Sequence, residues 1–257
     1  MNPIDAYNDT IKRARTFLVY HDGLVNTRAR SIRSDWKASF LALMHWPTSH
    51  EIARIDGKDA IVVLKNGASL TPDHFSSACL DDMLRASLTF GVSALDRYVH
   101  ERVVKGIVKA LKSASLTRQQ EEFSIPVTVA IHISEEALKA HKANKSIRTT
   151  NIVRTKVQEL LHKRPFQNWR DIDFAFNLLG VTDVAGQLQK AYEIGNIKPI
   201  QTQLNHIANR RNSIVHEGDL VRHIRGGTVK MKPITRKYVE DSLNFIDSLV
   251  GHLEKVA

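Results

Sequence analysis

A helical pattern that continues from Thr71 to about Ser113 constrains the fold of this chain more than any other feature. Thr71-Pro72-Asp73 is typical of a helix start, with threonine as cap, proline at the first position and an acid in the first turn. A helix this long with so broad an apolar surface belongs at the centre of a bundle. Its two neighbouring apolar stripes consist of Leu80, Leu84, Leu88, Gly91, Leu95 and Tyr98, and of Val92, Val99 and Val103.

Helical spacing also dominates the rest of the chain. We expect further helices over residues 4–21, 34–45, 134–143, 150–162, 169–179, 199–216 and 235–256. The last has near-heptad apolar spacing, which suits either the core or a dimer interface. Strand patterns at 51–55 and 60–64 flank Asp56-Gly57-Lys58-Asp59 and predict a hairpin. The fold class is therefore all-α, with a β-hairpin elaboration over 1–70 packed on a helical domain over 71–257.

The charge of the chain is unevenly distributed. Of its formal net charge of +10, residues 139–170 contribute nine Lys and Arg against one acid, and residues 209–237 contribute eight against two. A localised basic surface on a neutral-to-acidic body is typical of a polyanion binder. The alternative is a solvated lysine-rich face.

Several classes of protein are disfavoured by what the sequence lacks. Its single cysteine, Cys79, permits no intrachain disulfide, which suits a reducing compartment. No apolar run approaches the roughly 18–20 residues that span a bilayer, and the first residues lack a signal-peptide pattern, so we expect a cytoplasmic protein without membrane contact. Phosphate-binding glycine motifs, GxSxG, HExxH and paired CxxC are missing. We therefore expect no metal and no cofactor.

One short segment carries a recognisable set of polar groups. On a helix, Arg211 aligns with apolar positions between Leu204 and Val215, while Asn212 and His216 belong to an adjacent uncharged polar stripe. Gly218 would cap the helix and place His216 in its last turn. An arginine in line with core positions is costly unless it has a partner or a function.

This segment resembles the HEPN superfamily, whose ribonucleases carry an R-x(4–6)-H motif that often has a polar residue directly after the arginine. Arg211-Asn212-Ser213-Ile214-Val215-His216 matches the form RNxxxH, and it lies on the penultimate helix, before a last amphipathic helix. Together with residues 78–112 as the long helix, the pattern is most similar to the RiboL-PSP branch over residues 71–257. The resemblance implies a HEPN-like helical bundle, a homodimer with a composite active site, and a toxin or anti-phage effector restrained by a neutralising partner protein.

The chemistry that these residues suit is metal-independent cleavage of RNA. Arg211 can grip the scissile phosphate and stabilise charge in the transition state. An imidazole exchanges protons near neutral pH, so His216 can act as general base or acid. Attack by the 2′-hydroxyl would leave a 2′,3′-cyclic phosphate, and DNA would not be cut. The reaction needs a base and an acid, and two facing copies would supply two histidines.

Other residues are candidates for supporting roles. Asn212 could hydrogen-bond His216 or the phosphate, and Asp96 or Glu101 could pair with Arg211 or orient the site. Phe166 and Trp169 could stack on RNA bases, although core packing is the alternative. The basic side chains expected to bind RNA are Arg210, Lys142, Lys145, Arg148, Lys163 and Arg164.

Three alternatives to a ribonuclease stay open at this point. Arg211 could be a buried arginine paired with a core acid, and His216 an ordinary residue near a helix end. The chain could be a non-catalytic HEPN-fold module that binds nucleic acid, a nucleotide or a partner. A DNA-binding regulator would need a helix-turn-helix, for which the sequence offers only the basic stretch 139–170.

Overall fold

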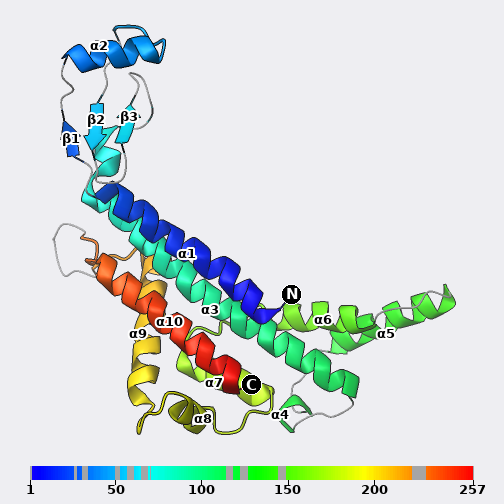
Figure 1. Cartoon of the computed structure of the whole chain (residues 1–257). Helices are drawn as coiled ribbons and strands as arrows, with labels where there is room; N and C mark the ends of the chain where they lie inside the picture. Colours follow the sequence, from blue (N-terminus) through cyan, green and yellow to red (C-terminus); the bar gives the residue numbers. More distant parts are fainter. Residues whose placement is uncertain are drawn as a thin grey trace.

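The computed structural model describes residues 2–25, 28–30, 34–49, 53–56, 61–64, 69, 71–113, 118–121, 127–143, 149–221 and 230–256. The described chain is mostly helical (Figure 1). Its helices are α1 (Pro3–Val25), α2 (Ser34–Leu43), η1 (Pro72–Phe75), α3 (Ser77–Ser113), α4 (Arg118–Glu121), α5 (Val127–Lys142), α6 (Thr149–Leu161), α7 (Trp169–Leu178), α8 (Val184–Ala191), α9 (Lys198–Glu217) and α10 (Arg236–Val256). None of these helices is both long and apolar enough to cross a membrane.

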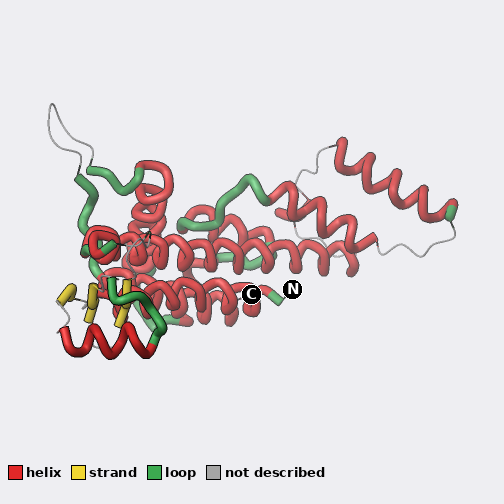
Figure 2. The backbone as a smooth tube through the Cα atoms, turned by 90° about the horizontal axis from the view of Figure 1, so that it is seen from above, coloured by secondary structure: helices red, strands yellow, loops and turns green. Residues whose placement is uncertain are grey.

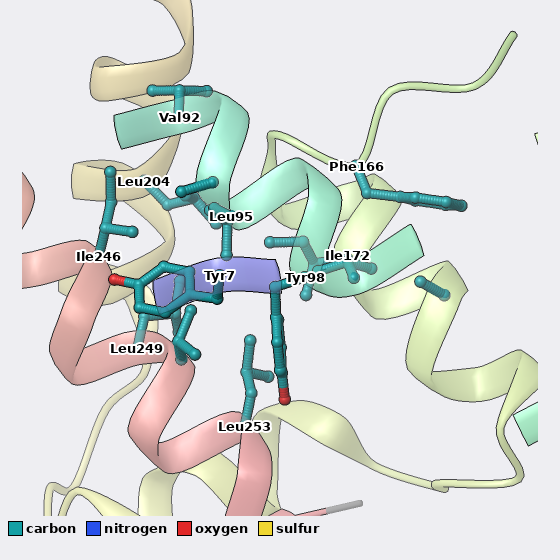
Figure 3. Packing of buried hydrophobic residues seen from close by; sticks show 14 of the residues in the cluster. Tyr7, Val92, Leu95, Tyr98, Phe166, Ile172, Leu204, Ile246, Leu249 and Leu253 are labelled. Atoms are coloured by element: carbon teal, nitrogen blue, oxygen red, sulfur yellow. The ribbon is translucent and has the colours of Figure 1, made fainter. Parts of the chain in front are cut away.

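Helix α3 is the spine of the bundle, as its two apolar stripes predict. It contacts α1, α6, α7, α9 and α10. Figure 3 shows Leu95 and Tyr98 of α3 within a cluster that includes Leu249 and Leu253 of α10. Helix α10 buries its near-heptad side chains, from Val239 to Leu253, in this core. Of the two roles predicted for that pattern, the structure therefore supports core packing.

Helix α1 runs antiparallel to α3 and shares its core. The Ser87 hydroxyl donates to the Ala14 carbonyl at 2.8 Å, and the Tyr7 ring meets the Tyr98 ring edge-on with centroids 6.3 Å apart. The Tyr7 hydroxyl donates to the carboxylate of Asp247, which ties α1 to α10. Burial raises the pKa of Tyr7 well above its ordinary value, and the Asp247 carboxylate raises it further. Although α1 precedes residue 70, it is thus part of the bundle core.

A small antiparallel sheet lies beyond α1 and α3 at one end of the bundle. Its strands are β1 (Arg28–Arg30), β2 (Ala53–Asp56) and β3 (Ile61–Leu64), in the order β1-β2-β3. Asp56 pairs with Ile61 in the segment where a hairpin is predicted, and residues 57–60 of its turn lie outside the described residues. Figure 2 shows the sheet and α2 at one end of the bundle and α5 reaching past it at the other.

Several element boundaries differ from the sequence-based expectation. Thr71 caps the short 3-10 helix η1, and α3 begins only at Ser77. Helix α5 begins at Val127 instead of Ser134, and the short helices α4 and α8 are not predicted. The early residues of α5 are mostly β-branched and weak in helix propensity, so the sequence pattern places the start of this helix later than the structure does.

The packing of the spine predicts a large effect of a cavity at Leu95. Leu95 is fully buried, so Leu95→Ala should lower the free energy of unfolding by about 3 kcal/mol through lost burial and the remaining cavity. Leu138→Ala on α5, where the side chain is 60% exposed, is the matched control and should change it by less than about 0.5 kcal/mol. Urea unfolding followed by circular dichroism measures both. Equal effects of the two substitutions would contradict the assignment of α3 as the spine.

Candidate active site at the end of helix α9

The termination of α9 places the motif at an exposed helix end. Gly218 adopts the left-handed conformation with φ of 61°, and its N–H donates to the carbonyl of Ser213. This is the predicted glycine cap, and it confirms that His216 lies in the last turn. His216 and Asn212 are both exposed, and their four-residue spacing puts them on one face of the helix.

Arg211 is half-buried and turned towards that same face. Its Nη1 donates to Asn212 Oδ1 at 3.1 Å, so the guanidinium lies beside the residue that shares a face with His216. Its Nε is buried, and among the described residues it has no hydrogen-bond partner. Of the predicted apolar stripe, Leu204 is buried as expected, whereas Val215 at the other end is 46% exposed. Arg211 is therefore at the edge of the core, with a buried Nε and with Nη1 bonded to an exposed side chain.

The neighbouring Arg210 has a different role. Its Nη2 donates to Asp219 Oδ2 at 2.8 Å and to the backbone carbonyls of Lys232 and Pro233. Arg85 of α3 donates to the same Asp219 oxygen from its Nε, also at 2.8 Å. Asp219 is completely buried, and both arginine side chains are largely covered. Arg210 was predicted to bind RNA, but here it holds a buried carboxylate.

Asp219 also fixes the course of the chain beyond the motif. It has a positive φ of 57° and follows the glycine cap directly. Its carbonyl accepts from the Lys232 backbone N–H at 2.7 Å, next to the bridge that pairs Leu220 with Met231. The Lys232 ammonium donates to the Ser213 hydroxyl on α9. These contacts join the end of α9 to the segment that leads into α10.

The two acids predicted to orient the site lie elsewhere. Asp96 accepts from the backbone N–H of Phe166, and its carboxylate is 3.6 Å from His100 Nδ1. Asp96 and Glu101 both line a groove between α1, α3 and α6. Among the described residues neither forms an ion pair with Arg211. The carboxylates close to the motif are instead Glu217, which accepts from the Ser213 hydroxyl at 3.3 Å, and Asp219, which is reached through Arg210.

The other predicted RNA-binding residues divide into three groups. Lys142 and Lys163 are exposed, whereas Lys145 and Arg148 lie outside the described residues. Arg164 pairs with Asp171 at 3.4 Å and covers the ring of Phe174, so it has contacts within the protein. For the aromatic pair, the core-packing alternative is the one observed. Phe166 is fully buried and Trp169 packs partly buried against the core.

Sequence reasoning missed Arg85 and Asp219, which form the best-defined polar cluster near the motif. The available signal was an arginine within the apolar pattern of the central helix and an acid directly after a glycine cap. Each is common alone, and their pairing spans 134 positions of sequence. Only the folded arrangement brings the two together.

The described residues contain no group of three or more His, Cys, Asp and Glu side chains placed to hold a metal ion. In comparisons with models of protein families, with curated proteins and with solved structures, nothing matches this chain. The residues of this site and the motif they form are therefore the features that bear on function.

The cluster around Asp219 predicts a strong dependence of stability on this carboxylate. Asp219→Asn keeps the side-chain shape and tolerates positive φ, but leaves Arg85 and Arg210 without their shared counter-charge. We expect the free energy of unfolding to fall by about 3 kcal/mol, measured by urea denaturation. Asp241→Asn removes an exposed partner of Lys237 and should leave stability close to that of the parent protein. Equal stability of the two variants would contradict a structural role for Asp219.

Proposed function

We propose that this protein is a metal-independent endoribonuclease of the HEPN type. The observation that carries the proposal is the hydrogen bond from the Arg211 guanidinium to Asn212, which lies on the face where His216 is exposed. The alternative was that Arg211 is a buried arginine paired with a core acid. This alternative loses support, because it is the neighbouring Arg210 that pairs with the buried Asp219. The motif's resemblance to RNxxxH supports the family, and with it a role as a toxin or anti-phage effector restrained by a neutralising partner protein.

The reaction follows from the chemistry of the two motif side chains. Arg211 binds non-bridging oxygens of the scissile phosphate, and its charge is most favourable when negative charge grows on them. His216 accepts the proton of the 2′-hydroxyl as its oxygen bonds to phosphorus. The bond from phosphorus to the 5′-oxygen breaks, and a second imidazole donates a proton to that leaving oxygen. The products are a 2′,3′-cyclic phosphate and a 5′-hydroxyl.

The second imidazole comes from a second copy of the chain in this proposal. Exposed apolar side chains surround the motif: Val215 on α9, and Leu220 and Met231, which pair in the bridge just beyond the glycine cap. Apolar groups exposed next to polar functional groups are typical of a protein interface. A two-fold contact here would bring two His216 side chains to one substrate.

Single substitutions in the motif test the proposed site. Arg211→Ala and His216→Ala should each reduce RNA cleavage in EDTA by about a hundredfold or more, since each removes a group that acts in the transition state. His206→Ala is the matched control, because His206 is exposed on the same helix but outside the motif, and it should retain activity. Cleavage is followed on end-labelled RNA, with the cyclic-phosphate terminus identified by mass spectrometry.

The variants must share the parent's fold and oligomeric state, checked by circular dichroism and light scattering. Cleavage that disappears in EDTA, or that persists in both motif variants, would contradict the proposal. If no RNA is cleaved but RNA binding depends on Arg211, a non-catalytic binding module would replace it.

A charge in the apolar surface beside the motif tests the dimer. Val215→Lys should shift the protein towards monomer in sedimentation equilibrium, because an ammonium would have to be buried at the interface. RNA cleavage should fall in parallel, since each monomer has one motif histidine. Val19→Lys on α1, where the side chain is 67% exposed and distant in sequence from the motif, should change neither property. Full activity in a monomeric Val215→Lys variant would contradict a composite site.

A further inference from the structure

A groove lies between α1, α3 and α6. The groove has a volume of about 480 Å³, within the range of about 300–1,000 Å³ that is usual for small-molecule sites. The described residues that line it belong to these three helices and to the position that follows α6, and none of them belongs to α9 or α10. The groove is therefore separate from Arg211 and His216, and the proposed cleavage reaction does not use it.

The floor of the groove is held rigidly by His100 of α3. One ring nitrogen lies 2.9 Å from the Asp96 carbonyl and the other 3.1 Å from the Leu161 carbonyl at the end of α6. The ring also meets Phe166 edge-on at 4.6 Å, and Asp96 accepts from the Phe166 backbone N–H. These contacts fix α6 and the connection to α7 against α3, so the groove is preformed.

The middle of the groove presents donors suited to a phosphate. Arg13 of α1 and Arg97 of α3 are both exposed there, with the Ser93 hydroxyl one turn from Arg97. Within the described part of the chain Arg13 pairs with the exposed Asp9, and such surface pairs are weak enough for a phosphate to replace. Two guanidinium groups are a common way to bind a phosphate with directed hydrogen bonds.

One end of the groove is aromatic. Phe90 lines it and is stacked on Phe17 with centroids 5.5 Å apart, so the ring is held in place from behind. Phe90 lies two helical turns from Arg97, about 10 Å along the axis, which is the length scale of one nucleotide. An aromatic surface at that distance from a phosphate site suits a nucleobase. At the other end, Glu101 offers an acceptor for amino or hydroxyl groups.

We propose that this groove binds a nucleoside monophosphate, with the phosphate at Arg13 and Arg97 and the base against Phe90. A simple anion would not use the aromatic end, and an apolar ligand would not use the two guanidinium groups. The combination of both ends in one preformed groove favours a nucleotide over either.

Isothermal titration of the full-length protein with each of the four nucleoside 5′-monophosphates tests the proposal. The titrations use the Arg211→Ala background, so that the motif on α9 cannot account for binding. We expect at least one nucleotide to bind, and inorganic phosphate or the free nucleoside to bind at least about tenfold more weakly. Arg13→Gln with Arg97→Gln should weaken binding by about tenfold or more, and Phe90→Leu by about fivefold.

Lys105→Gln is the matched control, since it removes an exposed positive charge of α3 outside the groove and should leave the affinity unchanged. Arg97→Lys, which retains the charge but loses the planar fork, should weaken binding even if the double variant fails to fold. Absence of binding by all four nucleotides would overturn the proposal. So would unchanged affinity in the folded arginine variants, or binding of inorganic phosphate as tight as that of a nucleotide. Because the readout is binding, these outcomes do not depend on whether RNA is cleaved.

Discussion

The buried carboxylate of Asp219 joins three parts of the chain that the motif needs in fixed positions. Arg85 reaches it from the central helix and Arg210 from α9, while its own carbonyl holds the segment leading into α10 through Lys232. Removing these charges from water is unfavourable, so the arrangement is stable only when all partners are in place. The end of α9 cannot move independently of the spine without breaking this cluster. The polar groups beside it are therefore presented in a defined geometry, although they lie at a helix end, where chains usually fray.

Two adjacent arginines on α9 have separate roles because of their positions on the helix. Arg210 points towards α3 and the returning chain, where carbonyls and Asp219 satisfy its donors. Arg211 points towards Asn212 and the exposed face. A helix rotates by about 100° per residue, so consecutive positions face different surroundings. The protein thus places one guanidinium in its own structure and leaves the next available to a ligand.

Local patterns in the sequence predict the main helices well, but they do not predict contacts between segments that are distant in sequence. The apolar stripes of α3, the glycine cap of α9 and the amphipathic α10 depend on residues close in sequence, and all three are present in the structure. The short helix α8, which packs against α10, and the pairing of Arg85 with Asp219 depend on packing between distant segments. For the same reason Asp96 was assigned to the wrong neighbour. Its position on the central helix could be predicted, but its partner, the Phe166 backbone N–H in the turn after α6, could not.

The bridge between Leu220 and Met231 holds the chain that follows α9 against the chain that leads into α10. Val221 donates to the Lys230 carbonyl at 2.8 Å, which closes the ends of the intervening segment against each other. The entropic cost of a loop closed in this way grows only slowly with its length. Residues could thus be inserted or replaced between these two positions while α9 and α10 keep their places. Such changes would be tolerated beside the RNxxxH motif, because its position in the bundle would not depend on them.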